Sequence, residues 1–415
     1  MSYILALNCG SSTLKYQVFD SDTKQSIISG NVEKVGKPDA FVQQEYPDGK
    51  KVKKETALKD HAAALDLVIS MLTAASIDLK DIVAVGHRVA HGGEKFKHSI
   101  EITDEVIKTI DELSELAPLH NPANLAGILG AKKILPHARQ VAVFDTAFHQ
   151  TMPDYSYRYA VPGEWYRDLH VRKYGFHGTS HLYVSKRAAV MLGKPAAECN
   201  LISMHMGSGA SACAIKHGNC LTTSMGMTPL TGLVMGTRCG DLSPSVFMYV
   251  KEKMNLSDAE MMDILNKKSG ILGITEKYSD RRDVEKHIHD DDKCRLAYDI
   301  EAWRAKKYIG QYFAAIGEPI DAIIFTAGGG ERDWILREKI CEGLGALGAN
   351  LDKKLNKTAL AQLGAGETDL SAADSRVKIF MIPTDEEAVL VEDTIAIMNG
   401  TYNPNHLEMD YSFAH

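Results

Sequence analysis

Four side chains that can carry charge lie in short segments of a kind that binds anions. Arg88 and Arg238 each lie in a glycine-flanked segment, Asp145 follows the apolar run Val-Ala-Val-Phe, and His177 lies in Tyr-Gly-Phe-His-Gly-Thr-Ser-His. Arginine presents a planar fork of N–H donors that matches a carboxylate or a phosphate. Ligands of open α/β sheets bind beyond the carboxyl ends of the strands, where we expect these residues. Together they indicate a small-anion site, although each alone is also typical of a surface ion pair, a helix N-cap or a loop histidine.

Two glycine-serine turns repeat the same local pattern in the two halves of the chain. Residues 10–12 separate two apolar runs of strand length, and residues 207–209 do so again about two hundred residues later. Glycine permits positive φ, and the N–H groups freed in such turns can bind an anion. One such turn is most often an ordinary hairpin. Two of them at corresponding places predict a duplicated domain.

A third glycine cluster, residues 328–330, lies between an apolar run and the helical pattern that starts at Trp334. The N-terminus of a helix favours anions, so this place suits a nucleotide. Residues 343–348 match Gly-x-Gly-x-x-Gly, but they follow a helical pattern rather than a strand, and we interpret them as a helix end. The phosphate-loop motif of P-loop ATPases does not occur.

Short β-branched runs alternate with longer amphipathic stretches, which predicts an α/β protein. The polar stretch 34–54 is expected to form hairpins and loops at a sheet edge. The expected helices are 61–72, 298–313 and 334–347, and the expected strands are 3–7, 82–85, 140–144, 201–204, 322–325 and 377–381.

The composition argues against several classes of protein, including nucleic-acid-binding and membrane-spanning proteins. The 415 residues are 45% hydrophobic and 24% charged, and 47 basic against 54 acidic residues give a net charge of −7. This balance predicts no nucleic-acid partner. No apolar run is long enough to span a membrane, and the N-terminus lacks a basic leader. Seven scattered cysteines without a C-x-x-C pair fit reduced thiols, so we expect a cytoplasmic protein.

Several blocks in a fixed order resemble the acetate and propionate kinases of the acetokinase family, within the actin-like ATPase superfamily. The resemblance runs from Leu5 to Thr394. The blocks are Asn8-Cys-Gly-Ser-Ser-Thr-Leu-Lys, His87-Arg-Val-Ala-His-Gly-Gly, Ala117-Pro-Leu-His-Asn-Pro, Phe144-Asp-Thr-Ala-Phe-His, Tyr174-Gly-Phe-His-Gly-Thr-Ser-His, Thr223-Ser-Met-Gly-Met-Thr-Pro-Leu and Gly236-Thr-Arg-Cys-Gly-Asp.

The resemblance implies two duplicated actin-like, ribonuclease H-like domains with an active cleft between them. The first domain would span 1–150, with a helix of about 384–400 returning to it, and the second would span 151–383 and form a homodimer. The implied reaction is Mg²⁺-dependent, reversible transfer of phosphoryl from ATP to a short-chain carboxylate by direct in-line attack, with Mn²⁺ as a possible substitute for Mg²⁺. This is a phosphotransferase reaction with a carboxyl group as acceptor.

Matched positions give the implied roles of single residues. The catalytic residues would be Arg88, Asp145, His177 and Arg238. The substrate would also contact Ala90, Leu119, His120, Phe176 and Pro229. The nucleotide and its phosphates would contact Ser11, Ser12, Lys15, His205, Gly207, Ser208, Gly209, Asp280, Arg282, Gly328, Gly329, Gly330 and Glu331. The metal would be bound by Asn8 and Glu386.

Two departures from the family pattern leave details open. Gly329 stands where an aliphatic residue is usual, which suggests a looser loop, so a kinase with another phosphoryl donor is an alternative. Ala90 stands where acetate-preferring members commonly carry valine, which favours a larger acid such as propionate. A propionate- or butyrate-preferring kinase is therefore one alternative. A non-metabolic actin-like ATPase, acting as a filament or a chaperone, is an alternative from a different class.

Overall fold

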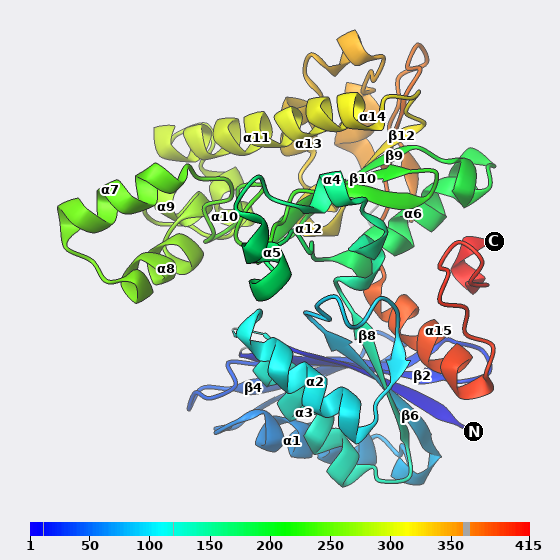
Figure 1. Ribbon diagram of the computed structural model, residues 1–415. Coiled ribbons are helices and arrows are strands. Elements are labelled where there is room, and N and C mark those ends of the chain that lie inside the picture. Colours follow the sequence, from blue (N-terminus) through cyan, green and yellow to red (C-terminus); the bar gives the residue numbers. More distant parts are fainter. Residues whose placement is uncertain (11, 119, 360–365) are drawn as a thin grey trace. The chain divides into compact units, whose positions relative to one another are not determined.

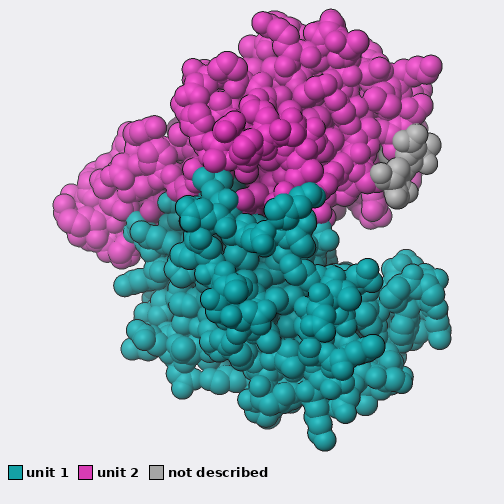
Figure 2. Space-filling model, turned by 90° about the vertical axis from the view of Figure 1, so that its right-hand side faces the viewer, with its two compact units in different colours: residues 1–150, 385–413, 415 teal, residues 151–384, 414 magenta. Residues whose placement is uncertain are grey.

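The structure is a computed structural model, and it describes residues 1–10, 12–118, 120–359 and 366–415. Two of the predicted site residues, Ser11 and Leu119, lie outside this part of the chain. The chain forms two compact units (Figure 2). Unit 1 contains residues 1–150, 385–413 and 415, and unit 2 contains residues 151–384 and 414.

Unit 1 is built on a mixed eight-stranded sheet with the order β5-β4-β3-β2-β1-β6-β8-β7. Neighbouring strands from β1 to β5 are antiparallel, whereas β1, β6 and β8 run parallel. The predicted edge hairpin within 34–54 corresponds to β4 and β5. The strands are β1 (Tyr3–Cys9), β2 (Thr13–Asp20), β3 (Ser26–Glu33), β4 (Phe41–Glu45), β5 (Lys51–Glu55), β6 (Ile82–Val89), β7 (Ile100–Glu101) and β8 (Arg139–Phe144).

Helices cover both faces of this sheet (Figure 1). Side chains alternate along β1, so Leu5 and Leu7 pack in the cluster that includes α1, while Ile4 and Ala6 pack with α15 on the opposite face. Helix α1 begins where the Asp60 side chain accepts a hydrogen bond from Ala63 N at 2.9 Å. The helices are α1 (His61–Ala74), α2 (Asp104–Glu112), α3 (Asn121–Ile134) and α15 (Glu386–Asn399).

Unit 2 repeats the central strand arrangement of unit 1. Its six-stranded sheet has the order β11-β10-β9-β12-β14-β13. An antiparallel meander, β9 to β11, adjoins the parallel strands β12 and β14, as β1 to β3 adjoin β6 and β8. The duplication predicted from the two glycine-serine turns is confirmed at this level. The strands are β9 (Leu201–Met206), β10 (Ala210–Lys216), β11 (Asn219–Thr223), β12 (Ala322–Thr326), β13 (Thr368–Asp369) and β14 (Lys378–Met381).

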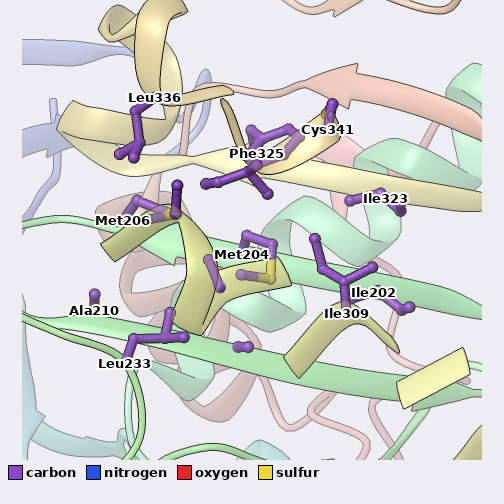
Figure 3. Close-up of a cluster of buried hydrophobic side chains, with 14 of the residues drawn as sticks. Ile202, Met204, Met206, Ala210, Leu233, Ile309, Ile323, Phe325, Leu336 and Cys341 are labelled. Carbon is purple, nitrogen blue, oxygen red and sulfur yellow. The ribbon is translucent and has the colours of Figure 1, made fainter. Parts of the chain in front are cut away.

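The core of unit 2 lies between this sheet and its covering helices. Met204 and Phe325 project from neighbouring strands in Figure 3 and lie near Leu336 and Ile309 from two helices. The helices are α4 (Asp154–Tyr157), α5 (Gly163–Leu169), α6 (Gly178–Leu192), α7 (Pro244–Met254), α8 (Asp258–Lys267), α9 (Gly270–Thr275), α10 (Arg281–Lys286), α11 (Asp292–Ile316), α12 (Ala327–Arg332), α13 (Trp334–Cys341) and α14 (Lys353–Thr358).

Two glycine segments differ in how well the sequence predicted them. Residues 343–348 follow α13 as expected of a helix end, and Gly343 and Gly348 have φ of +84° and +87°. Residues 328–330, in contrast, are not a loop, because they lie inside the short helix α12. In the described part of the chain, no helix is both long and apolar enough to cross a membrane.

Candidate active site

Unit 1 brings Asn8, Arg88 and Asp145 into direct contact. The Arg88 guanidinium donates from Nε to Asp145 Oδ1 at 3.0 Å and from Nη2 to Asp145 Oδ2, and its Nη1 donates to Asn8 Oδ1 at 3.1 Å. Asp145 is fully buried, and the Arg88 side chain is 19% exposed. Both oxygens of Asp145 are therefore engaged by Arg88, which fixes the guanidinium in one orientation.

The sheet explains why these three residues meet. Strands β1, β6 and β8 are parallel neighbours, and their registers pair Leu7 with His87 and Val89 with Phe144. Asn8, Arg88 and Asp145 consequently lie at one edge, at the carboxyl ends of three adjacent strands. This is the edge where open α/β sheets bind ligands.

Asn124, which the sequence analysis missed, ties two of these strand ends together. This buried residue of α3 accepts a hydrogen bond from Ala90 N at 2.9 Å and donates to Cys9 O at 2.7 Å. Ala90 itself is buried, with 2% of its surface exposed. His87, in the same block, is also buried and lies 2.7 Å from Gln140 Oε1. Burial lowers the pKa of His87 to about 4, so we interpret it as a neutral structural residue.

Helix α15 places Glu386 in the electrostatic environment of Arg88. The helix packs on β6 at Gly86, where an added Cβ would lie 2.6 Å from Thr394 Oγ1 and 3.3 Å from Leu390 O. Burial disfavours the charged form of Arg88, but Asp145 and, more weakly, Glu386 outweigh it and raise the pKa of Arg88. The guanidinium therefore stays charged at every accessible pH.

Three further predicted residues of unit 1 lie within the described part of the chain: Lys15, Ser12 and His120. Lys15 pairs with Asn8 in the β1–β2 hairpin register, and its side chain lines a shallow hollow together with Glu387. Ser12 is exposed. His120 is the residue before α3 and is partly exposed.

A chain of histidines and hydroxyl groups forms the corresponding part of unit 2. His177 Nδ1 and His181 Nε2 lie 2.9 and 2.8 Å from Ser211 Oγ, and His205 Nδ1 lies 2.8 Å from Ser180 Oγ. The rings of His177 and His205 stack with centroids 4.1 Å apart. The hydroxyls of Ser211 and Ser180 hold the His177 and His205 rings. Neither serine was predicted as a site residue, although Ser180 lies in the same block as His177.

Arg238 lies next to the second glycine-serine turn. Its Nη1 donates to Pro229 O at 3.0 Å. A Cβ added at Gly209 would lie 3.4 Å from the His177 ring and 3.5 Å from Arg238 Nη1. The turn therefore lies beside both groups, at a distance where even an added Cβ would make ordinary van der Waals contact with them. Phe176, which was predicted to contact the substrate, is buried in the core cluster of unit 2.

A pocket of about 430 Å³ opens beside this turn in unit 2. Six residues of the predicted nucleotide site line it together with five others. The predicted residues are Gly207, Ser208, Asp280, Arg282, Gly328 and Gly329. The additional residues are Ser279, Arg281, Glu285, Arg332 and Asp333.

Two predicted nucleotide residues have other contacts. Gly330 O accepts a hydrogen bond from Arg337 Nη1 at 2.8 Å. Glu331 Oε1 accepts one from Thr384 N at 3.2 Å, and burial raises the pKa of Glu331. Neither is among the residues that line the pocket. The expectation of a loose loop at Gly329 was wrong, because Gly329 lies in α12 and a Cβ there would come within 2.7 Å of Met206 O.

Comparisons with known proteins identify the family of the chain. The profile of the Acetokinase family matches residues 3–392. The chain is 53% identical to "Acetate kinase" of Geobacter sulfurreducens over 99% of this chain and 98% of that protein.

Solved structures lead to the same family. Acetate kinase of Porphyromonas gingivalis matches with a TM-score of 0.89 and 43% identity, over 96% of this chain and all of that one. A propionate kinase of Francisella tularensis matches with a TM-score of 0.87 and 38% identity, over 96% and 98% of the two chains. The fold predicted from the sequence, two actin-like domains of mixed α/β structure, is thereby confirmed. The chain belongs to the acetokinase family.

Proposed function

We propose that the protein transfers phosphoryl reversibly between ATP and acetate or propionate, giving acyl phosphate and ADP. The main support for the proposal is the position of Arg88. Asp145 and Asn8 hold its guanidinium at the ligand-binding edge of the unit 1 sheet. Family membership and the full-length similarity to acetate and propionate kinases support the same reaction.

The acceptor chemistry fits these residues. A short carboxylate is ionised near pH 7, so no strong base is needed before it attacks phosphorus. The difficulty is to bring two anions together, which positive charge and positioning overcome. We assign this task to Arg88 and Arg238, and assign to His177 and His205 hydrogen bonds to the phosphoryl group. Asp145 acts as an orienter of Arg88, because both of its oxygens already accept hydrogen bonds from that residue.

The proposed metal is Mg²⁺, bound by Asn8 and Glu386. Amide and carboxylate oxygens are ligands that Mg²⁺ prefers. Asn8 Oδ1 accepts one hydrogen bond from Arg88 and keeps a second lone pair. When bound, the ion would neutralise phosphate charge. Lys15, opposite Asn8 in the hairpin, would add positive charge for the phosphates.

A coupled assay for acyl phosphate tests the proposal directly. Purified protein with ATP, Mg²⁺ and acetate or propionate should form acyl phosphate and ADP in equal amounts. Parallel reactions with pyrophosphate in place of ATP test the donor. Formation of nucleotide-dependent polymers without any acyl phosphate would support the filament alternative and contradict the kinase.

Ala90 gives a prediction about the acid. Valine has two methyl groups more than alanine, and space for one methylene is worth about 0.8 kcal/mol. We expect propionate to be used at least as well as acetate, and Ala90→Val to shift the kcat/KM ratio toward acetate by roughly tenfold or less. Measuring both acids on both proteins checks this. An unchanged ratio in Ala90→Val would mean that Ala90 does not set the pocket size.

We further propose a homodimer that forms through unit 2, in the cytoplasm. Several large apolar side chains of this unit are exposed, including Tyr155, Met248, Tyr249, Met254 and Trp303, each more than 60% exposed. Met248, Tyr249 and Met254 all lie on the helix α7, and apolar residues that gather on one surface favour an interface. Light scattering should give twice the mass of the chain, and Tyr249→Lys combined with Trp303→Lys should shift the protein to monomer. A monomeric wild-type protein at working concentration would contradict the proposal.

A further inference from the structure

Arg281 and Glu301 form a buried ion pair in the wall of the unit 2 pocket, and the sequence analysis singled out neither residue. Arg281 is the first residue of α10 and lines the pocket, with 10% of its side chain exposed. Glu301 lies on α11, and its side chain is 1% exposed. A buried charge pair is stable only when further hydrogen bonds satisfy it.

All three guanidinium nitrogens of Arg281 donate to the protein. Nε donates to Glu301 Oε1 at 2.7 Å, and Nη2 donates to the same oxygen. Nη1 donates to Gly207 O at 2.6 Å and lies 3.4 Å from Met206 O. These bonds lie in the plane of the guanidinium. What such an arginine can offer a ligand is mainly the flat face of that plane, and guanidinium faces stack on aromatic rings.

Gly329 explains how this arginine fits. A Cβ at Gly329 would lie 2.7 Å from Met206 O and 3.2 Å from both Cδ and Nη1 of Arg281. Any larger residue at 329 would therefore displace either Arg281 or the end of β9. The glycine at 329 and the arginine at 281 thus form one packing arrangement.

The charged side chains around the pocket differ from those expected of a phosphate site. Three carboxylates, Asp280, Glu285 and Asp333, line it together with three guanidinium groups, those of Arg281, Arg282 and Arg332. The neighbouring Arg282 differs from Arg281, because it is exposed and bonded to Asp280 at 2.5 Å. A lining with balanced charge suits an uncharged heterocycle better than a polyphosphate.

We propose that Arg281, held flat by Glu301, is the platform on which the purine base of the phosphoryl donor stacks. This inference rests on the proposed kinase function and specifies the nucleoside part of its substrate. Stacking on a guanidinium depends on ring area, so a purine diphosphate should bind more tightly than a pyrimidine diphosphate. Pyrophosphate has no base and should not depend on Arg281.

Calorimetric titration of the full-length protein with ADP, CDP and pyrophosphate, each with Mg²⁺, tests the platform. Arg281→Lys keeps the charge next to Glu301 but removes the flat face. We expect it to weaken ADP binding about tenfold while pyrophosphate binding changes by less than about twofold. Glu301→Gln should weaken ADP binding in the same direction and leave the KM for the carboxylate unchanged, because it frees Arg281 to turn.

Asp299→Asn is the matched control. It removes an acid from the same helix at an exposed ion pair, where Lys339 Nζ lies 2.6 Å from Asp299 Oδ1. Its affinity for ADP should equal that of the wild type. On the wild-type protein, which carries no folding risk, ADP should bind about tenfold more tightly than CDP.

Three results would overturn the platform: wild-type affinity for ADP in folded Arg281→Lys, an equal loss of ADP and pyrophosphate binding, or equal binding of ADP and CDP by the wild type. If Arg281→Lys does not fold, the comparison of ADP with CDP and the Glu301→Gln titration decide. Failure of the kinase proposal would appear separately, as absence of acyl phosphate with any donor.

Discussion

Alanine in place of Arg88 should lower kcat by roughly 10²–10³ or more, and alanine in place of Arg238 should do the same. The reason is electrostatic. Positive charge is needed most while phosphoryl moves between two anions, so its loss affects the transition state more than substrate binding. Steady-state rates of acyl phosphate formation, with KM determined for both substrates, check the expectation. We expect kcat to fall much more than either KM rises.

Lysine variants separate charge from geometry. Arg88→Lys keeps the charge but cannot reproduce the three-way contact with Asp145 and Asn8, so it should recover only part of the loss. Arg139→Lys is a matched control. Like Arg88, Arg139 donates two hydrogen bonds to one carboxylate, that of Glu101, but it lies at the opposite end of β8 from Asp145. It should leave kcat near that of the wild type. Normal turnover in both alanine variants would refute the assignment of Arg88 and Arg238.

Asp145→Ala should affect both stability and activity. Removing one partner of a buried ion pair costs about 3–5 kcal/mol, since the other charge is left without its partner. Because part of the Arg88 side chain is exposed, water can solvate its charge and reduce this loss of stability. The thermal unfolding midpoint should fall by several degrees, and kcat should fall with the loss of Arg88 orientation. Unfolding followed by calorimetry and the rate of acyl phosphate formation measure the two effects.

The pH profile of Asp145→Asn distinguishes orienting from proton transfer. Asparagine keeps the shape of aspartate but accepts from Arg88 with one oxygen only. If Asp145 orients Arg88, kcat should fall by a similar factor at every pH between about 6 and 9. Recovery of the rate as pH rises would instead indicate that Asp145 accepts a proton. That outcome would contradict the role assigned to it here.

Local signals in the sequence predicted the parts of the site that local structure determines. The turns at 10–12 and 207–209 follow from glycine between two apolar runs, and their repetition predicted two similar units. Arg88 and Asp145 were expected at strand ends because polar residues follow buried runs there. Parallel pairing of adjacent strands then placed these side chains side by side.

The features that the sequence did not predict depend on contacts between distant elements. Asn124 connects two strand ends from the middle of a helix, and no spacing rule identifies it. The partner of Arg281 is Glu301, which lies on another helix, α11, twenty residues later in the chain. Gly329 appeared to be a source of looseness, yet it is required by a close approach of Met206 and Arg281 that only tertiary packing creates.

The close approach of Gly86 to α15 has a consequence for how unit 1 can move. Gly86 contributes no side chain, so β6 approaches Thr394 Oγ1 and Leu390 O of α15 closely. Gly86 lies two residues before Arg88, and Leu390 lies four residues after Glu386. This close contact restricts how far β6 and α15 can shift relative to each other. We therefore expect Arg88 and Glu386, the residues proposed to bind the acid and the metal ion, to move together whenever unit 1 moves as a body.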